Sequence, residues 1–269
     1  MAAGRKFRKL SKAVDSVPFW WHSIELGDGV VSDGQRSADD LAAEWESLGL
    51  PDLRDKSVID VGAWDGYFSF RAEEAGAARV VALDHYAWSL DLARKEAYDD
   101  ECRAAGTVPV QYHAHPGIWR PEELPGKAGF DTAHRARDSR VESVVGDYLR
   151  MDLERLGTFD VVLFLGVLDR MRNPLLALER VARLARDLLV VETEAVAVPG
   201  FEHHGFAEFF ETNELNGDPT VWWAATRHAT MALCRSAGFA QVDSPAEPAN
   251  RPTRRDALHR YRLVVRAWK

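Results

Sequence analysis

The sequence has little cysteine and no long apolar run. Only two of its 269 residues are cysteines, Cys102 and Cys234, too few for a disulfide framework or a cysteine-rich zinc site. No apolar run approaches the roughly eighteen residues of a membrane span, and no apolar segment follows the basic N-terminus as a secretory signal requires. Internal repeats and low-complexity segments are also lacking. A reducing cytoplasm is therefore the expected location.

The chain also has fewer basic than acidic residues. The chain has 34 Lys and Arg against 42 Asp and Glu, which gives a formal net charge of −8. A protein whose main partner is a polyanion usually carries a basic surface, so this balance argues against a nucleic-acid partner. With 46% hydrophobic residues the chain can build the core of one large α/β domain. The oligomeric state stays open, a homo-oligomer included.

What is present is an alternation of apolar runs and helical patterns. This order predicts an α/β fold with a doubly wound, mostly parallel, Rossmann-like sheet whose faces are covered by helices. The predicted strands cover residues 58–61, 79–83, 141–145, 159–165 and 188–191, with a last, alternating strand in 259–269. The predicted helices cover 37–48, 67–75, 87–106, 129–139 and 175–185, and another begins at Asp218, where Pro219 suits an early helical position.

Two parts of the chain differ in character. Residues 1–50 are predicted as a helical and aromatic N-terminal extension that packs on the cleft, and residues 51–269 as the ligand-binding domain. Within that domain two connections, at about 86–125 and 195–220, are longer than a doubly wound fold needs. Long insertions at the loop end of such a sheet are usually functional, so both are expected near the active site.

Polar residues and glycines follow the ends of the predicted strands, where ligands of open α/β sheets bind. They are, in chain order, Asp60, Gly62 and Gly66 at the first strand, Asp84 at the second, Asp147 at the third, Gly166 and Asp169 at the fourth, and Glu192 at the fifth. For each residue taken singly, a structural role explains the pattern as well as a ligand does. Asp60 could anchor the turn, and Asp84 could cap a helix. Taken together, the first three strand ends favour a bound ligand.

The turn after the first strand, Gly62-Ala63-Trp64-Asp65-Gly66, narrows the choice of ligand. Trp64 and Asp65 stand where the pyrophosphate of a dinucleotide would approach the backbone, and an acid there suits a cationic ligand instead. Asp84 suits the two hydroxyls of a ribose, and Asp147-Tyr148 suits an adenine. A ligand with these groups, a cation and no phosphate is S-adenosylmethionine (SAM).

Several motifs resemble those of a known family. VIDVGAWDGYFSF, VVALD, VVGDY and VLFLGVL resemble the successive motifs of the class I SAM-dependent methyltransferases. With FWWHSIELGDG, LGVLDRMRNPLLALERV and ELNGDPTVWW, the chain resembles more narrowly the CmoB-like group, relatives of the tRNA wobble-uridine carboxymethyltransferase. The resemblance covers about Pro18 to Phe239 and implies the seven-stranded sheet of that family. It implies cofactor contacts at Gly62, Asp84, His85, Asp147, Tyr148 and Leu165.

Two departures from the family pattern bear on function. Trp64 replaces the middle glycine of the usual D-x-G-x-G-x-G, which implies an indole over the methionine part of the cofactor or against the substrate pocket. The tRNA enzyme has Leu-Tyr-His where this chain has Leu168-Asp169-Arg170, and that tyrosine helps to hold the extra carboxylate of carboxy-SAM. Asp169 would repel that carboxylate, and Arg170 is displaced by one residue, so plain SAM is the predicted cofactor.

Methyl transfer needs an aligned acceptor and, for a hydroxyl or thiol, removal of a proton. The candidate catalytic residues are Asp169, His22 and Glu192, with His203, His204 and His228 as further candidate bases. The candidate substrate-binding residues are Trp21, Arg170, His203 and Trp222. His22 and Trp222 could instead have purely structural roles. His203 could instead lie in a solvated loop. His113 and His115 have metal-like spacing without a third ligand nearby, so no metal is predicted.

The leading hypothesis is a SAM-dependent methyltransferase that acts on oxygen or nitrogen of a small molecule, such as a sugar or a natural product of secondary metabolism. Two alternatives stay open. One is a carboxy-SAM-dependent enzyme that modifies the wobble uridine of tRNA, and the other is a SAM-binding protein without catalysis. A dehydrogenase is disfavoured because Trp64 and Asp65 block the approach of a pyrophosphate.

Overall fold

The computed structural model describes residues 2–245 and 258–269, and the chain divides into two compact units. Unit 1 comprises Met1–Glu46, Asp52–Asp55 and Gly62–Asp147, and unit 2 comprises Ser47–Pro51, Lys56–Val61 and Tyr148–Lys269. Within the described ranges, no helix is both long enough and apolar enough to cross a membrane.

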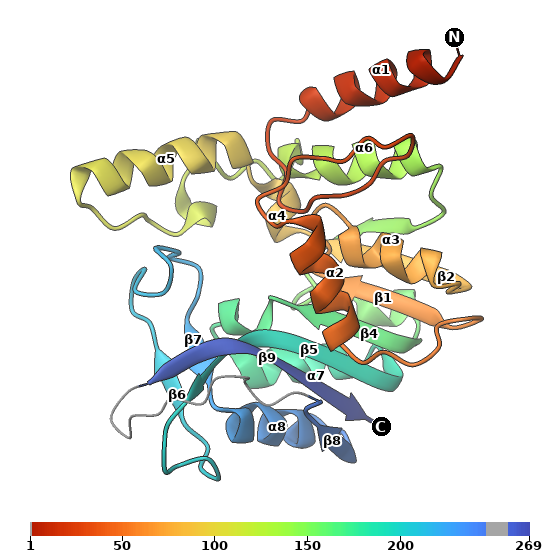
Figure 1. The fold of residues 1–269 in the computed structure, drawn as a ribbon. Helices are drawn as coiled ribbons and strands as arrows, with labels where there is room; N and C mark the ends of the chain where they lie inside the picture. The colour runs from red at the N-terminus through yellow and green to blue at the C-terminus, as the bar shows by residue number, and fades with distance from the viewer. Residues whose placement is uncertain (1, 246–257) are drawn as a thin grey trace. The chain divides into compact units, whose positions relative to one another are not determined.

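The described residues form one sheet whose main path, β3-β2-β1-β4-β5-β7-β6, contains seven strands; β9 pairs with β5, and β8 pairs with β9. The strands are β1 Ser57–Val61, β2 Arg79–Asp84, β3 Glu142–Val145, β4 Phe159–Leu165, β5 Ala185–Ala197, β6 Ala207–Phe209, β7 Trp223–Ala225, β8 Gln241–Asp243 and β9 His259–Trp268. The pairs β2–β3, β1–β4 and β4–β5 are parallel, whereas β9 runs antiparallel to β5 (Figure 1). The predicted doubly wound, mostly parallel sheet is confirmed.

Strand β4 is the centre of unit 2. It lies between β1 and β5, and its apolar run is almost entirely buried, as expected for a parallel strand covered on both faces. Strand β5 pairs with β9 along Leu188–Ala197, which fills one edge of β5. The other edge is shared, because β4 pairs with β5 as far as Glu192 and β7 takes over at Ala195. The turn that follows β4 therefore lies beside the junction of these strands.

The helices of unit 2 begin at side-chain caps. Helix α7 (Pro174–Ala182) begins at Asn173, whose Oδ1 accepts from the Leu176 N–H at 3.1 Å, and proline follows at the first helical position. Helix α8 (Arg227–Ser236) begins at Thr226, whose Oγ1 accepts from Ala229 N–H at 3.3 Å. Both helices pack against each other and against β5.

Unit 1 contains β2, β3 and most of the remaining helices. These α-helices are α1 Ala2–Asp15, α2 Ala38–Ser47, α3 Tyr67–Glu74, α4 Tyr86–Ser89, α5 Leu92–Ala105 and α6 Ala128–Arg137. The 3-10 helices of the two units are η1 Tyr112–Ala114, η2 Pro125–Lys127, η3 Leu153–Leu156 and η4 Leu168–Arg170. Helix α2 confirms the prediction over 37–48, since Ser37 Oγ accepts from the Asp40 N–H at 3.1 Å.

The helix predicted to begin at Asp218 is wrong. The Asp218 carboxylate accepts from the Thr220 N–H at 2.8 Å and from Thr220 Oγ1 at 2.6 Å. Such a local side-chain bond offers the backbone an alternative to the helix. Residues 218–222 are therefore irregular, and they lead into β7 at Trp223.

Three other predictions change in extent. Strand β5 runs over Ala185–Ala197 instead of 188–191, and with β6 it occupies part of the expected insertion at 195–220. The helix predicted over 87–106 is divided at Leu90, whose backbone is extended, and Asp91 Oδ1 then caps α5. Strand β3 begins at Glu142 instead of 141, and it is exposed along most of its length because it stands at the end of the strand order.

Truncation of the β4 core tests this fold. Leu163 is fully buried between β1 and β5, so Leu163→Ala should lower the free energy of unfolding by about 2–5 kcal/mol. Chemical denaturation measures this loss, with Leu176→Ala on the 44% exposed position of α7 as the control. Equal losses in the two variants would contradict the placement of β4.

Candidate functional site

The turn between β1 and α3 follows an unusual backbone path. Gly62, Trp64 and Gly66 have positive φ angles of 90°, 47° and 87°. A Cβ at Gly66 would lie 2.7 Å from the Phe130 ring, so glycine is required there. A non-glycine residue with positive φ needs support from its surroundings, and the Trp64 N–H has it, because it donates to Asp84 Oδ2 at 3.0 Å.

The Asp84 carboxylate joins this turn to helix α4. Its Oδ2 accepts from Trp64, and its Oδ1 accepts from the Ala87 N–H at 3.0 Å. Burial raises the pKa of Asp84. The backbone N–H groups of His85 and Trp88 also stabilise the charged carboxylate, so Asp84 has the surroundings of a helix cap, and its ribose role stays a prediction. Nearby, Gly146 N–H donates to the Asp84 carbonyl at 3.1 Å, which brings the segment before Asp147 to the end of β2.

The residue after Asp84 contacts the first predicted insertion. The His85 ring stands edge-on to Trp119, with 5.4 Å between ring centroids, and Tyr86 lies 5.3 Å from the same indole. Trp119 lies in the residues after α5 and is partly buried. The insertion at 86–125 thus supplies an aromatic side chain to the predicted adenine-ribose edge, and sequence reasoning did not single it out.

Aromatic residues of the N-terminal segment enclose Trp64. The Trp21 ring stacks on Trp64 with 4.8 Å between centroids and 5° between planes, and Phe19 stacks at 6.4 Å. The Trp88 indole N–H donates to the Trp64 carbonyl at 2.7 Å. Trp64 Nε1 is buried and has no hydrogen-bond partner within the described part of the chain. Trp21, a predicted substrate-binding residue, thus packs on the predicted cofactor turn.

Asp65 has a different role from the one its position suggests. The sequence argument treats it as a countercharge for a cationic ligand, but the side chain is fully buried. Its Oδ2 accepts from the backbone N–H groups of Trp21 and His22 at 2.7 and 3.0 Å. A Cβ at Gly129 would lie 2.4 Å from Asp65 Oδ1, so α6 packs directly on the carboxylate. Asp65 is therefore the anchor of the N-terminal segment.

His22 has the surroundings of a structural residue. Its ring packs near Tyr67 and Phe68, with centroids 6.0 Å from each. Burial, with a smaller effect of the Arg36 charge, lowers the pKa of His22 to about 3. A group with that pKa takes up little proton near neutrality, so the geometry favours the structural alternative over a general base.

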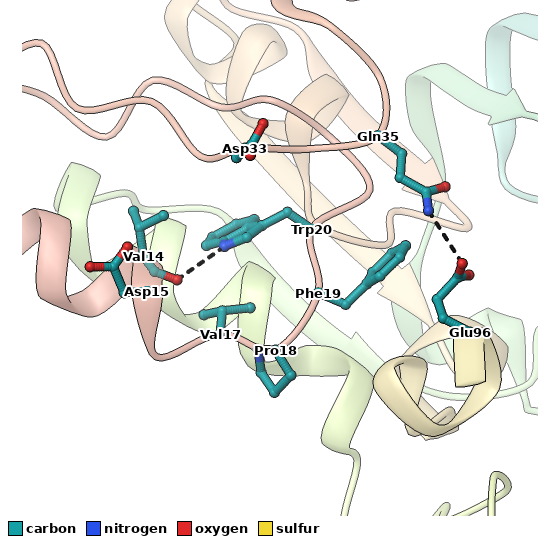
Figure 2. Close-up of a pocket in the computed structure, with 9 residues that line it drawn as sticks. All are labelled: Val14, Asp15, Val17, Pro18, Phe19, Trp20, Asp33, Gln35 and Glu96. Carbon is teal, nitrogen blue, oxygen red and sulfur yellow. Dashed lines mark hydrogen bonds between the residues drawn. The ribbon is translucent and has the colours of Figure 1, made fainter. Parts of the chain in front are cut away.

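Unit 1 also has an open pocket beside the N-terminal segment (Figure 2). Its volume is about 340 Å³, and one wall is formed by Trp20, whose indole N–H donates to the Val14 carbonyl at 3.3 Å. The lining residues are Val14, Asp15, Val17, Pro18, Phe19, Trp20, Asp33, Gln35 and Glu96. The residues predicted to bind the cofactor or substrate are absent from this lining.

Unit 2 brings two predicted catalytic residues to one arginine. Glu192 forms two short hydrogen bonds with the Arg262 guanidinium, to Nε and Nη2. Arg262 Nη1 lies 3.2 Å from Glu194 Oε1 and 3.6 Å from Asp169 Oδ2. Although burial disfavours the charged guanidinium, Glu192, Asp169 and Glu194 together raise the pKa of Arg262 above its usual range. Sequence reasoning missed Arg262, because an alternating strand does not reveal which strand it pairs with.

Asp169 and its neighbour Arg170 do not pair with each other. Arg170 Nη1 lies 2.7 Å from Asp218 Oδ2 and also makes a short hydrogen bond with Thr220 Oγ1, and Nε donates to the Gly166 carbonyl at 3.2 Å. Asp169 is only 2% exposed, and its Oδ1 has no hydrogen-bond partner among the described residues. Arg170 thus holds the turn after β4, and its predicted substrate contact stays a prediction.

The remaining residues of unit 2 that were predicted to bind substrate or cofactor lie in different environments. Trp222 donates its backbone N–H to the Asp169 carbonyl at 2.8 Å, and its ring lies near Phe209 and 4.5 Å from the Arg172 guanidinium carbon. His203 is exposed in a turn. Asp60 is buried in β1, Tyr148 packs edge-on to Phe164, and Leu165 ends β4. In the described ranges no group of three His, Cys, Asp or Glu residues is arranged to hold a metal ion.

Comparisons with known proteins give a fold but no family. No family model matches the chain, and no curated protein matches it in sequence. The N-terminal domain of EvdMO1, solved in the presence of S-adenosylhomocysteine (SAH) and D-fucose, is 19% identical, with 97% of this chain and 96% of that chain covered and a TM-score of 0.56. The same domain with SAH bound is 18% identical, with the same coverage and TM-score. At this identity the likeness shows the fold alone, the class I SAM-dependent methyltransferase fold.

The match extends to a longer form of that neighbour. EvdMO1 itself is 16% identical, with a TM-score of 0.56, and 97% of this chain covers 47% of that chain. The similarity therefore lies in the domain that was solved with SAH, and it includes nearly the whole of the present sequence.

Burial of Asp65 predicts a pH-dependent stability. Burial raises its pKa from 3.8 to about 7, against the opposing hydrogen bonds from His22 and Trp21 and with a further increase from Asp84. Because the folded pKa exceeds the unfolded value, this contribution is complete below pH 4 and is lost as the pH rises through 7. It amounts to about 4 kcal/mol.

The measurement is the difference in unfolding free energy between wild type and Asp65→Asn from pH 4 to pH 8. Wild type should lose stability relative to this variant across the interval, because asparagine does not titrate. Asp100→Asn, whose side chain is 72% exposed in α5, is the control for loss of a carboxylate. Parallel pH profiles for wild type and Asp65→Asn would refute the assignment.

Proposed function

We propose that this protein is a SAM-dependent methyltransferase that transfers a methyl group to oxygen or nitrogen of a small molecule. The observation that carries the proposal is the left-handed turn 62–66, whose Trp64 N–H donates to Asp84 at the end of β2, in a chain with the class I methyltransferase fold. The N-terminal domain of EvdMO1, which has a similar fold, was solved in the presence of SAH and D-fucose. A sugar or a related natural product is the proposed class of acceptor.

The residues of unit 1 fit SAM. Asp84 ends β2 and is the proposed partner of the ribose hydroxyls, and His85 and Trp119 offer aromatic faces beside it. The buried Trp64 Nε1 can donate a hydrogen bond to a ligand, since it has no partner among the described residues. SAM supplies a methyl group on a positively charged sulfur. We assign Gly62, Gly66 and Asp147 of unit 1 to this cofactor site on their sequence positions, and the predicted cofactor contacts of Asp60, Tyr148 and Leu165 in unit 2 rest on the sequence motifs.

Asp169 is the proposed catalytic residue. Both oxygens of Glu192 bond to Arg262, so Glu192 holds the arginine, whereas Asp169 Oδ1 has no hydrogen-bond partner in the described ranges. That oxygen can accept a proton from an acceptor or orient it by a hydrogen bond. His22, with its low pKa, has no part in this proposed mechanism.

The charges of unit 2 favour plain SAM over carboxy-SAM. Among the described residues Arg262 forms an ion pair with Asp169 at 3.6 Å, but Glu192 and Glu194 also bind this arginine. Arg170 is paired with Asp218. A further carboxylate would meet three carboxylates and no unpaired arginine of this cluster, which is unfavourable. The CmoB-like resemblance and a tRNA substrate therefore form the second hypothesis, carried by the sequence motifs, and a non-catalytic SAM-binding protein is the third.

A ligand panel tests the cofactor. A ligand at one hundred times its Kd should stabilise the fold by ~2.7 kcal/mol, which thermal unfolding detects. We expect stabilisation by SAM and SAH but not by NAD, and a weaker effect of carboxy-SAM. Asp84→Asn should raise the Kd of SAM roughly tenfold or more, because it removes a charged acceptor. Asp52→Asn, at an exposed carboxylate, is the control.

The outcomes separate the hypotheses. Stabilisation by NAD alone would refute the cofactor assignment, and a preference for carboxy-SAM would refute the argument from Asp169. Release of SAH with a sugar panel, compared with bulk tRNA, then distinguishes the small-molecule enzyme from the tRNA enzyme. SAM binding with no turnover on either substrate class would favour the non-catalytic alternative.

A further inference from the structure

The turn after β4 carries a carboxylate oxygen without a hydrogen-bond partner in the described part of the chain. Asp169 is 2% exposed, and within the described residues its Oδ1 has no hydrogen-bond partner. The backbone around it is fixed, because the Asp169 carbonyl accepts from Trp222 N–H at 2.8 Å and Arg170 holds the Gly166 carbonyl. A buried polar atom without a partner is rare in proteins and calls for a ligand or another specific explanation.

The charges around this oxygen are mostly negative. Glu192, Glu194 and Asp169 contribute three carboxylates around the single guanidinium of Arg262. The neighbouring Arg170 does not offset the excess, because Asp218 pairs with it at 2.7 Å. The cluster therefore retains a net negative charge, which attracts a cation and repels a carboxylate or a phosphate.

Arg262 also determines how Asp169 is presented. Arg262 Nη1 lies 3.6 Å from Asp169 Oδ2, so the guanidinium attracts one oxygen of the carboxylate. A Cβ at Gly166 would lie 3.5 Å from Arg262 Nη2, which shows that the turn backbone lies directly against the arginine. Oδ2 thus faces Arg262, and Oδ1 has no donor within residues 2–245 and 258–269.

We propose that the acceptor is an amino sugar whose amino group binds at Asp169 Oδ1 and receives the methyl group. This inference rests on the proposed methyltransferase function and specifies its substrate class. An ammonium group supplies both a hydrogen-bond donor for Oδ1 and the positive charge that the cluster lacks. Carboxylate oxygens of the cluster also accept hydrogen bonds from sugar hydroxyls.

The proposed methyl transfer to nitrogen requires one proton transfer, from the ammonium group of the sugar to Asp169. Asp169 Oδ1 takes a proton from the bound ammonium group, which frees the nitrogen lone pair. That lone pair forms the N–CH3 bond as the C–S bond of the sulfonium donor breaks and its electron pair passes to sulfur. The products are an N-methylammonium sugar and SAH, and the proton on Asp169 passes to solvent.

The test compares matched sugars with the full-length protein and SAM. D-fucose, its analogues with an amino group in place of each hydroxyl in turn, and the corresponding uronic acid differ mainly in charge. We expect the best amino analogue to exceed D-fucose at least tenfold in kcat/KM for SAH formation, and the uronic acid to be the poorest. Asp169→Asn should abolish the preference for the amino sugar, whereas Glu208→Gln, at the carboxylate that pairs with Arg260, should retain it.

The results identify which inference fails. An absence of SAM-induced stabilisation in wild type would refute the proposed function itself. If SAM stabilises the protein but D-fucose or the uronic acid equals every amino analogue, or if no amino analogue is methylated, the amino-sugar proposal is overturned. The wild-type comparison decides this even if Asp169→Asn fails to fold, and circular dichroism identifies such a failure.

Discussion

The binding of Arg262 by carboxylates is the interaction on which the candidate site of unit 2 depends. Taking charges out of water is costly, and the cost is offset only when partners with good geometry replace the solvent. Glu192 supplies two hydrogen bonds to the guanidinium, and Glu194 and Asp169 add attraction at 3.2 and 3.6 Å. Without the guanidinium three carboxylates would repel one another. The same arginine therefore joins β9 to β5 and makes the orientation of Asp169 possible.

The strands were predictable because their apolar runs are continuous. The apolar run at 159–165 needs burial on both faces, and a parallel sheet covered by helices provides it. The run therefore predicts that β4 is a central strand of such a sheet. A local sequence signal gave a wrong prediction where side-chain contacts competed with the helix. Pro219 suits a helix start, but the Asp218 side chain bonds to Thr220 and to Arg170 instead. The length of β5 was missed because its partner β9 is distant in sequence.

The residues of the candidate site were predictable where they lie in one turn or at a strand end. They were not predictable where the interacting residues are far apart in the sequence. The glycines of the turn 62–66 and Asp84 at the next strand end follow from strand positions, and the structure joins them through Trp64. The partners of Asp65, in contrast, are 44 and 43 residues away, so its anchoring role could not be read locally. Arg262 lies 70 residues from Glu192, and alternation along a strand gives a face but not a register.

The central claim is that Arg262 acts through Asp169, and a double-mutant cycle tests it most directly. The cycle compares kcat/KM for SAH formation in wild type, Asp169→Asn, Arg262→Met and the double variant, with Arg260→Met as the control on the same face of β9. The account predicts that the two substitutions are strongly non-additive, with a coupling of about 1 kcal/mol or more. Additive effects, or equal coupling of Asp169 with Arg260, would contradict it.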